Sequence, residues 1–259
     1  MELSLYQIDA FANHVFEGNP AAVCPLDQWL PDDVMQSIAM ENHLSETAFF
    51  VPTRQGFHIR WFTPVAEVNL CGHATLASAF VIFNNLDYTK DKIIFDSHSG
   101  PLMVERRDSL FVMDFPSQEP VPCNPPTALL EAFSIPPVEC LQSEDYMLVF
   151  DTEQDVLSAK PDLPRLCTLD LRGVIITAPS AGYDFVNRFF APKYYVNEDP
   201  VTGSAFTQLA PYWAARLGKK DLNARQVSQR GGDVSCSVIR DRVEIMGNAV
   251  GYFKGSIQI

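Results

Sequence analysis

The sequence carries one pattern twice, and this duplication limits the possible folds more than any other feature of the chain. In the first half, FVPTRQGFHIRWFTP ends at Pro64, and in the second half TAPSAGYDFVNRFFAP ends at Pro192. Each stretch has a proline near its start, then an alternating segment, an arginine, two aromatic residues, a small residue and a final proline. Pro52 of the first copy thus corresponds to Pro179 of the second, and Pro64 corresponds to Pro192.

Two further matches follow in the same order. CGHATLASAF parallels TGSAFTQLA, with Gly72 opposite Gly203. An arginine-aspartate dipeptide then recurs, with Asp108 opposite Asp241. The offset between the copies grows slightly from match to match, as small loop insertions would make it do, whereas four matches in one order are not expected by chance. The sequence therefore predicts two copies of one domain with pseudo-twofold symmetry, because a solenoid would need many short repeats.

Prolines mark the join between the two copies. They concentrate between residues 116 and 137, a composition typical of a linker. We predict an N-terminal domain over residues 1–118 and a C-terminal domain over residues 119–259. A terminal strand can still cross from one domain into the other.

The hydrophobic pattern within each copy predicts mostly strands. Residues 56–62 and 183–190 alternate between apolar and polar side chains, as the strands of a half-buried sheet do. Residues 102–115 and 235–247 are expected to form hairpins that turn at the arginine-aspartate dipeptides.

One dominant helix is expected in each copy, over residues 72–86 and 203–218. The first is apolar nearly all round and must be enclosed on every side, which favours a curled sheet around it. In the second, Pro211 is expected to kink or interrupt the helix. A separate amphipathic helix is predicted over residues 31–42. The fold class is therefore α+β, with two pseudo-symmetric domains, each a curled, mostly antiparallel sheet around a central helix.

Composition excludes several classes of function. The formal net charge of −13 argues against nucleic-acid binding, which needs a basic surface, so local groups must hold any anionic substrate. The N-terminus lacks the pattern of a signal peptide, and the apolar runs are too short to span a bilayer. The six cysteines are scattered without a Cys-x-x-Cys pair, which is typical of reduced thiols. We expect a cytoplasmic protein that binds neither nucleic acid nor membranes.

Both predicted central helices begin at a glycine that follows a short irregular segment. The first N–H groups of a helix lack internal partners and bind carboxylates and phosphates well, and glycine allows a ligand to approach closely. The simpler alternative is that Thr202 and Ser204 cap the second helix and that Gly72 and Gly203 only form turns. The matching positions in the two copies favour a ligand site.

Cys71 and His73 could form a reactive pair. However, residues two positions apart at a helix start usually point apart, and the second copy has no cysteine at the equivalent place. A small apolar role for Cys71 on a tight turn is at least as well supported. Metal binding has less support, because the five histidines are widely spaced and show no ligand motif. We therefore predict no metal site.

Glu46 is the more informative acid. It lies immediately before the apolar run of residues 48–51, where partial desolvation of a carboxylate would raise its pKa toward neutrality and suit a general base. The alternative is a glutamate in a surface loop, which is what most glutamates are.

Four stretches resemble the PhzF-like (phenazine biosynthesis-like) family, within the diaminopimelate epimerase-like fold. They are DAFANHVFEGNPAAV, LSETAFF, NLCGHATLASAF and EDPVTGSAFTQLAPYWA, in the family's order and spread over nearly the whole chain. The resemblance implies two similar domains, each a curled sheet around a central helix, with the active site between them. It also implies an enzyme without cofactor or metal that is commonly a homodimer.

The resemblance also implies roles for particular residues. The catalytic residues would be Glu46, His73 and Asp199. The substrate-binding residues would be Asn19, Gly72, Gly203 and Ser204, with Asn19 assigned on weaker grounds.

The family's characterised phenazine enzyme isomerises a dihydro-hydroxyanthranilate by moving a proton between carbons. This implies a cofactor-independent isomerase for a small carboxylate-bearing substrate, with Glu46 as general acid and base. The related two-cysteine epimerases use a thiol at each helix start, and here only Cys71 remains. A racemase or epimerase, a non-catalytic carboxylate-binding protein and a Cys71-dependent hydrolase are the alternatives. The sequence does not identify the substrate or the direction of reaction.

Overall fold

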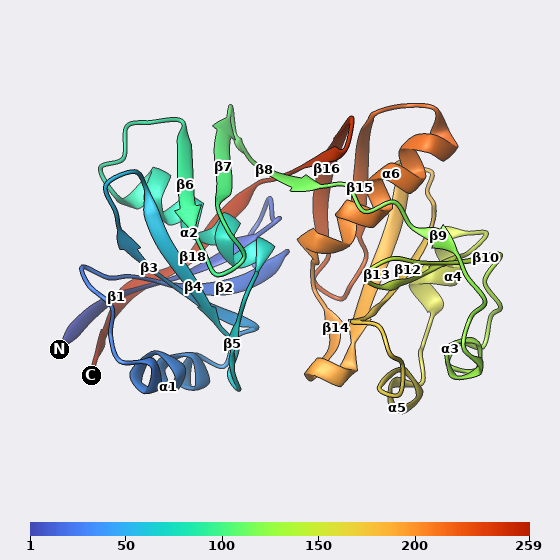
Figure 1. The fold of residues 1–259 in the computed structure, drawn as a ribbon, viewed down its shortest axis with the longest axis horizontal. Helices are drawn as coiled ribbons and strands as arrows, with labels where there is room; N and C mark the ends of the chain where they lie inside the picture. The colour runs from blue at the N-terminus through green and yellow to red at the C-terminus, as the bar shows by residue number, and fades with distance from the viewer. The chain divides into compact units, whose positions relative to one another are not determined.

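A computed structural model describes residues 1–259, which form two compact units (Figure 1). The first unit comprises residues 1–114 and 246–259, and the second comprises residues 115–245. The predicted domains, 1–118 and 119–259, differ from these units at the C-terminus. There β18 (Ala249–Gln258) pairs antiparallel along β1 (Glu2–Ala10), so the end of the chain belongs to the first unit.

The first unit is a curled sheet with two helices. Its other elements are β2 (Asn19–Pro25), α1 (Asp32–Asn42), β3 (Glu46–Pro52), β4 (Phe57–Phe62), β5 (Glu67–Val68), α2 (Gly72–Asn85), β6 (Lys92–Asp96), β7 (Leu102–Arg107) and β8 (Leu110–Pro116). Most neighbouring strands are antiparallel, and the β2–β3 and β4–β6 pairs are parallel.

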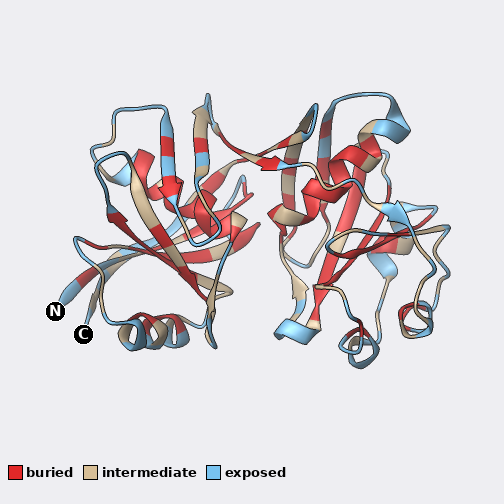
Figure 2. Cartoon of the chain, viewed as in Figure 1, coloured by how far each residue is buried: buried red, intermediate tan, exposed pale blue.

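The central helix α2 is enclosed by this sheet, as its uniformly apolar sequence predicts (Figure 2). Ten of its fourteen residues are buried. The two buried hydroxyl side chains satisfy themselves within the helix, because Thr75 donates to the carbonyl oxygen of Cys71 and Ser78 donates to that of Ala74. The helix can therefore be buried all round without an unpaired hydroxyl group.

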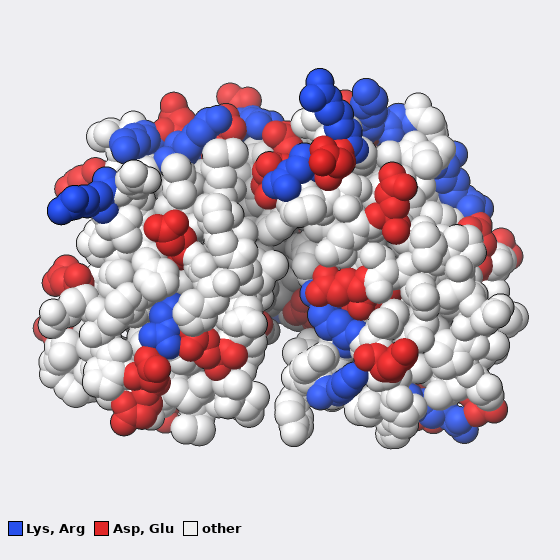
Figure 3. Space-filling model, in the orientation of Figure 1, with Lys and Arg blue, Asp and Glu red and all other residues white.

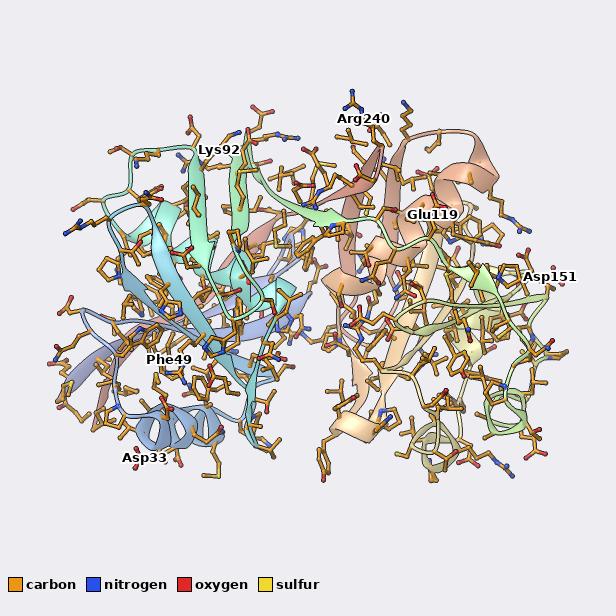
Figure 4. All side chains as sticks on the ribbon, viewed as in Figure 1. Asp33, Phe49, Lys92, Glu119, Asp151 and Arg240 are labelled. Atoms are coloured by element: carbon orange, nitrogen blue, oxygen red, sulfur yellow. The ribbon has the colours of Figure 1, made fainter.

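Helix α1 packs on the outer face of the same sheet. Its apolar residues Met35 and Ile38 belong to the same buried core cluster as Phe49 of β3, which is fully buried and is labelled in Figure 4. Asp33, on the same helix, is exposed. The predicted amphipathic helix is thus confirmed, with one face on the sheet and the other in water.

The second unit repeats this plan with extra elements at its start. All elements of the second unit, in chain order, are β9 (Val121–Pro122), α3 (Thr127–Glu131), β10 (Glu139–Gln142), β11 (Tyr146–Val149), α4 (Glu153–Ser158), α5 (Leu163–Leu166), β12 (Val174–Pro179), β13 (Phe185–Ala191), η1 (Pro192–Tyr194), β14 (Val196–Asp199), η2 (Gly203–Ala205), α6 (Phe206–Leu217), β15 (Asp221–Gln226), β16 (Gly232–Ile239) and β17 (Arg242–Gly247).

Strand pairing in the two units follows the same scheme, as the internal duplication predicts. In the first unit, β2–β3 is parallel, β3–β4 antiparallel, β4–β6 parallel and β6–β7 antiparallel. In the second, β11–β12, β12–β13, β13–β15 and β15–β16 have the same four senses in the same order. Each unit inserts its central helix between the two strands that pair in parallel, α2 between β4 and β6 and α6 between β13 and β15.

The central helix of the second unit differs from the expectation. It begins as the short 3₁₀ turn η2 and continues as α6 through Pro211 without interruption. Proline has no N–H group for the carbonyl oxygen of Thr207, one turn earlier. The backbone N–H of Gln118 donates to that oxygen instead, at 3.0 Å, so the free acceptor is satisfied from outside the helix.

Charged side chains of both signs lie on the surface of the protein. Basic side chains on the face shown in Figure 3 are interspersed with acidic ones and form no continuous stripe. None of the helices combines the length and the apolar composition that crossing a membrane requires.

Candidate active site

The start of α2 presents backbone N–H groups without a side-chain cap. Cys71 occupies the N-cap position in an extended conformation, with φ −145° and ψ 110°, and makes no capping hydrogen bond through its side chain. The N–H of Thr75 makes the first helical bond, to the carbonyl oxygen of Cys71. The preceding N–H groups of the first turn therefore carry the partial positive charge of a helix start.

Glu46 and His73 meet at this helix start. Glu46 is the first residue of β3, and its Oε2 atom lies 3.1 Å from Nε2 of His73. The His73 side chain is 7% exposed and that of Glu46 is 17% exposed. Although the two atoms are close, the ring N–H is not aimed at the oxygen, and this buried Oε2 atom has no hydrogen-bond partner. Oε2 thus lies within ion-pair distance of His73 without accepting a hydrogen bond.

Asn19 holds the other side of the imidazole ring. Its amide nitrogen lies 3.3 Å from Nδ1 of His73, and its amide oxygen accepts a hydrogen bond from the Ser45 hydroxyl. In this orientation Nδ1 of the neutral ring is an acceptor, so the proton is on Nε2, the ring nitrogen nearer to Glu46. Protonation of Nδ1 would require the Asn19 amide to turn its oxygen toward the ring.

Charge around His73 favours its protonated form. Burial by itself would lower the pKa of His73, but the Cys71 sulfur and the Glu46 carboxylate oppose burial and raise this pKa well above its ordinary value. Burial also raises the pKa of the Cys71 thiol, and repulsion by Glu46 adds to it. Because the thiol stays protonated at neutral pH, Glu46 supplies the negative charge that stabilises the imidazolium.

Cys71 lies closer to His73 than the sequence analysis expected. Its Sγ atom is 3.5 Å from Nδ1 and 4.0 Å from Nε2 of the ring. The expectation that the two side chains point apart was wrong, because the extended N-cap backbone turns Cys71 back over the first helical turn.

Glu46, Cys71 and His73 could also act together as metal ligands. One ligand atom from each lies within 4.8 Å of the others, a grouping that spacing along the chain did not reveal because Glu46 comes from a different strand. The set supplies one oxygen, one sulfur and one nitrogen, and these donors suit zinc.

The corresponding helix start in the second unit is built from hydrogen-bonded polar groups. Thr202 donates its hydroxyl to the Asp199 carboxylate, and its backbone N–H donates to Gln226 at 2.9 Å. Gln226 donates in turn to the carbonyl oxygen of Asp199 at 2.7 Å. These bonds fix the turn that leads into Gly203.

Ser204 follows this turn and is partly buried. Its hydroxyl oxygen accepts a hydrogen bond from Arg172 at 3.0 Å. Arg172 is held by Asp145, which is completely buried. Neither of these two residues was predicted for the site, because each lies far before Ser204 in the chain and no local motif marks it.

The predicted site residues therefore fall into two groups. Asn19, Glu46, Gly72 and His73 come together in the first unit, and Asp199, Gly203 and Ser204 lie along one turn of the second. A separate surface pocket of the first unit, about 480 Å³ in volume, contains none of them.

The fold of this chain also occurs in solved structures of distant sequence. The crystal structure of a probable proline racemase from Agrobacterium radiobacter matches 99% of this chain and 92% of its own, with a TM-score of 0.65 and 9% identity, which shows a shared fold. The chain belongs to the phenazine biosynthesis-like family, whose sequence pattern it matches over residues 8–255.

Close relatives support this assignment over the full length. A Pseudomonas aeruginosa protein named as an uncharacterized isomerase is 51% identical over 259 residues, covering all of both chains. The crystal structure of a PhzF-family phenazine biosynthesis protein from Enterococcus faecalis is 45% identical, covers all of both chains and has a TM-score of 0.98.

Proposed function

We propose that the protein is a cofactor-independent isomerase that moves a proton between carbons of a small carboxylate-bearing substrate. The observation that carries the proposal is the Oε2 atom of Glu46, which is buried, has no hydrogen bond and lies 3.1 Å from His73. A carboxylate oxygen in this position can take a proton from carbon, and a neighbouring imidazolium stabilises the charge that results.

The proposed reaction needs only one acid–base group. A C–H bond of the substrate breaks, its electron pair moves into a conjugated system, and the proton passes to the Glu46 carboxylate. The same carboxyl group then returns the proton to a different carbon, and the double bonds shift accordingly. No atom is gained or lost, so Glu46 ends in its starting state.

The other residues of the first unit have supporting roles in this proposal. His73 stays protonated beside Glu46 and stabilises negative charge, and Asn19 orients its ring. Gly72, at the start of α2, contributes to substrate binding through the N–H groups of the first helical turn. Cys71 has no required role, because burial and the nearby carboxylate hold its thiol in the protonated form.

In the second unit, the proposal assigns substrate binding to Gly203 and Ser204 and a proton-relay or orienting role to Asp199. The support is the resemblance of the turn to the first unit's helix start and the ordered hydrogen bonds around it.

Solvent exchange tests the proposal directly. A dihydro-hydroxyanthranilate and other unsaturated carboxylates are incubated with the protein in D₂O, and deuterium on carbon is followed by NMR and mass spectrometry together with isomer formation. We expect an isomer to form. Glu46→Gln should lower the rate at least about hundredfold, since general acid–base catalysis contributes about 10²–10⁴-fold. Circular dichroism should show that this variant remains folded.

Each alternative gives a different result. A carboxylate-binding protein would bind substrates, as thermal shift reports, without forming an isomer. An epimerase would place deuterium on the same carbon that lost its proton. A fully active Glu46→Gln variant would contradict the assignment of Glu46.

A further inference from the structure

We infer that Arg172 is a positioning residue that fixes the Ser204 hydroxyl as a hydrogen-bond donor for the substrate carboxylate. The inference rests on the proposed function, because it gives Ser204 a substrate to bind. It adds to the site the buried Asp145 and the partly buried Arg172, which both come from outside the helix start.

Asp145 anchors the arrangement. Its side chain is completely buried, and its carboxylate accepts from Nε of Arg172 at 2.9 Å, from a terminal nitrogen of the same guanidinium, and from Gln208 at 2.8 Å. The backbone N–H of Asp145 donates back to Gln208. A two-point contact to a buried carboxylate defines the plane and the direction of the guanidinium. The Phe189 ring, 5.4 Å from the guanidinium carbon, packs on one face of that plane.

With two of its nitrogens on Asp145, Arg172 directs the third toward Ser204. Nη1 donates to the Ser204 hydroxyl oxygen at 3.0 Å. The oxygen therefore acts as an acceptor toward Arg172, and its own O–H must point elsewhere. The carbonyl oxygen of Ser204 itself already accepts from the Thr207 hydroxyl at 2.7 Å.

Arg172 is poorly suited to bind an anion itself. Its charge is matched by Asp145, and Glu144 lies 3.3 Å from Nη1 on the same side as Ser204. The partly exposed Ser204 hydroxyl is then the group that can donate a hydrogen bond to a carboxylate. Arg172 thus orients the donor, whereas the hydroxyl makes the contact.

Arg188 is an arginine of the same unit whose hydrogen bonds support the fold alone. It also makes a two-point contact to a carboxylate, that of Glu198, at 2.7 and 2.9 Å. Its remaining donors bind the backbone carbonyl oxygens of Val156 and Ala159. Because it contacts none of the proposed site residues, Arg188→Lys is the matched control for Arg172→Lys.

A double-mutant cycle tests the inference with 2-aminobenzoate, a stable fluorescent carboxylate, as the probe. Arg172→Lys keeps the positive charge that pairs with Asp145. It loses the planar guanidinium group, whose nitrogens donate to Asp145 and to Ser204 at the same time. We expect it to weaken binding about tenfold, the equivalent of one hydrogen bond to a charged group. In a Ser204→Ala background the same change should alter the Kd less than twofold, and Arg188→Lys should leave it unchanged. Equal losses in both backgrounds would overturn the inference.

A second measurement needs no ligand and separates this inference from the proposed function. In Ser204→Cys, a guanidinium beside the sulfur lowers the thiol pKa, so iodoacetamide should label position 204 quickly at pH 7. Adding Arg172→Lys should slow labelling at least about threefold, as measured by peptide mass spectrometry, and adding Arg188→Lys should not. If the wild-type protein fails to bind 2-aminobenzoate, the binding proposal is weakened and the labelling rates decide the role of Arg172. Equal labelling rates with and without Arg172 would refute it.

Discussion

The starts of the two central helices share a scaffold but carry different chemistry. At the start of α2, a carboxylate, an imidazole and a thiol converge, and the pKa of His73 is raised. At the turn into α6, the polar groups are the Asp199 carboxylate, an amide, hydroxyl groups and a guanidinium, each of them hydrogen-bonded. All five histidines of the chain lie in the first unit, at positions 14, 43, 58, 73 and 98. The first helix start thus brings three kinds of ionisable side chain together, whereas the second consists mainly of hydrogen-bonded polar groups.

Away from the helix starts, the two units have kept the same construction. Arg60 of β4 makes a two-point contact to Glu67 at 2.7 Å, and Arg188 of β13 does the same to Glu198. Each guanidinium also lies about 5 Å from the second aromatic ring that follows it, 5.1 Å in the first unit and 5.0 Å in the second. These arginines are the ones that the repeated sequence pattern contains. The comparison indicates that duplication preserved the frame while the ligand-facing positions diverged.

The largest expected effect is the loss of stability on replacing Arg188, which should exceed the loss on replacing Arg60. Arg188→Leu should lower the free energy of unfolding by about 2–4 kcal/mol, because it breaks a partly buried ion pair with Glu198 and removes the donor to the carbonyl oxygens of Val156 and Ala159 at the end of α4. Arg60→Leu should cost about 1–3 kcal/mol less, since its third partner is Asp32, which is 76% exposed and returns to water. Urea denaturation of both variants measures the difference. Equal losses would show that the carbonyl contacts add nothing.

The strands and central helices of the two units were predictable from the sequence. The side chains at the two helix starts, where the units differ, were predictable only in part. Period-two alternation, the helix with no polar face and the repeated dipeptides are local signals, and they gave the strands, α2 and the hairpins. Glu46 was placed beside His73 only through the family resemblance, because their contact joins β3 to α2. Asp145 and Arg172 left no sequence signal, since a buried ion pair is defined by burial and direction in space.

The titration of His73 gives the next prediction. A raised folded-state pKa means that its stabilising contribution is fully present below the unfolded value, about 6.5, and is lost as pH rises through the folded value. In ring-proton NMR, His73 should therefore titrate above His58, whose pKa is lowered by burial and by repulsion from His98. Glu46→Gln should bring the His73 pKa down, because burial then acts without the carboxylate. An unchanged titration would mean that Glu46 is not the source of the shift.

The two equivalent hairpin turns should respond differently to glycine. Asp108 and Arg240 both adopt left-handed backbone, with φ 55° and 57°, and both are exposed; Arg240 is labelled in Figure 4. Arginine is strained there by about 1–2 kcal/mol, whereas aspartate tolerates this region better. After the entropic cost of glycine, Arg240→Gly should stabilise the protein by about 0.5–1 kcal/mol and Asp108→Gly should have almost no effect. Thermal unfolding of the two variants is the measurement, and a larger gain at Asp108 would contradict the explanation.

The smallest effect is expected at the residue that most resembles a reactive group. Cys71 lies 3.5 Å from His73, yet burial first and Glu46 second raise its thiol pKa, so it is a poor nucleophile and a poor base at neutral pH. Cys71→Ala should change the rate of deuterium incorporation less than about threefold, against at least about hundredfold for Glu46→Gln. A thiol reagent should modify the exposed Cys167 well before Cys71. Loss of activity in Cys71→Ala would assign the sulfur a chemical step and revive the two-base chemistry that the second unit, without a thiol at its helix start, otherwise argues against.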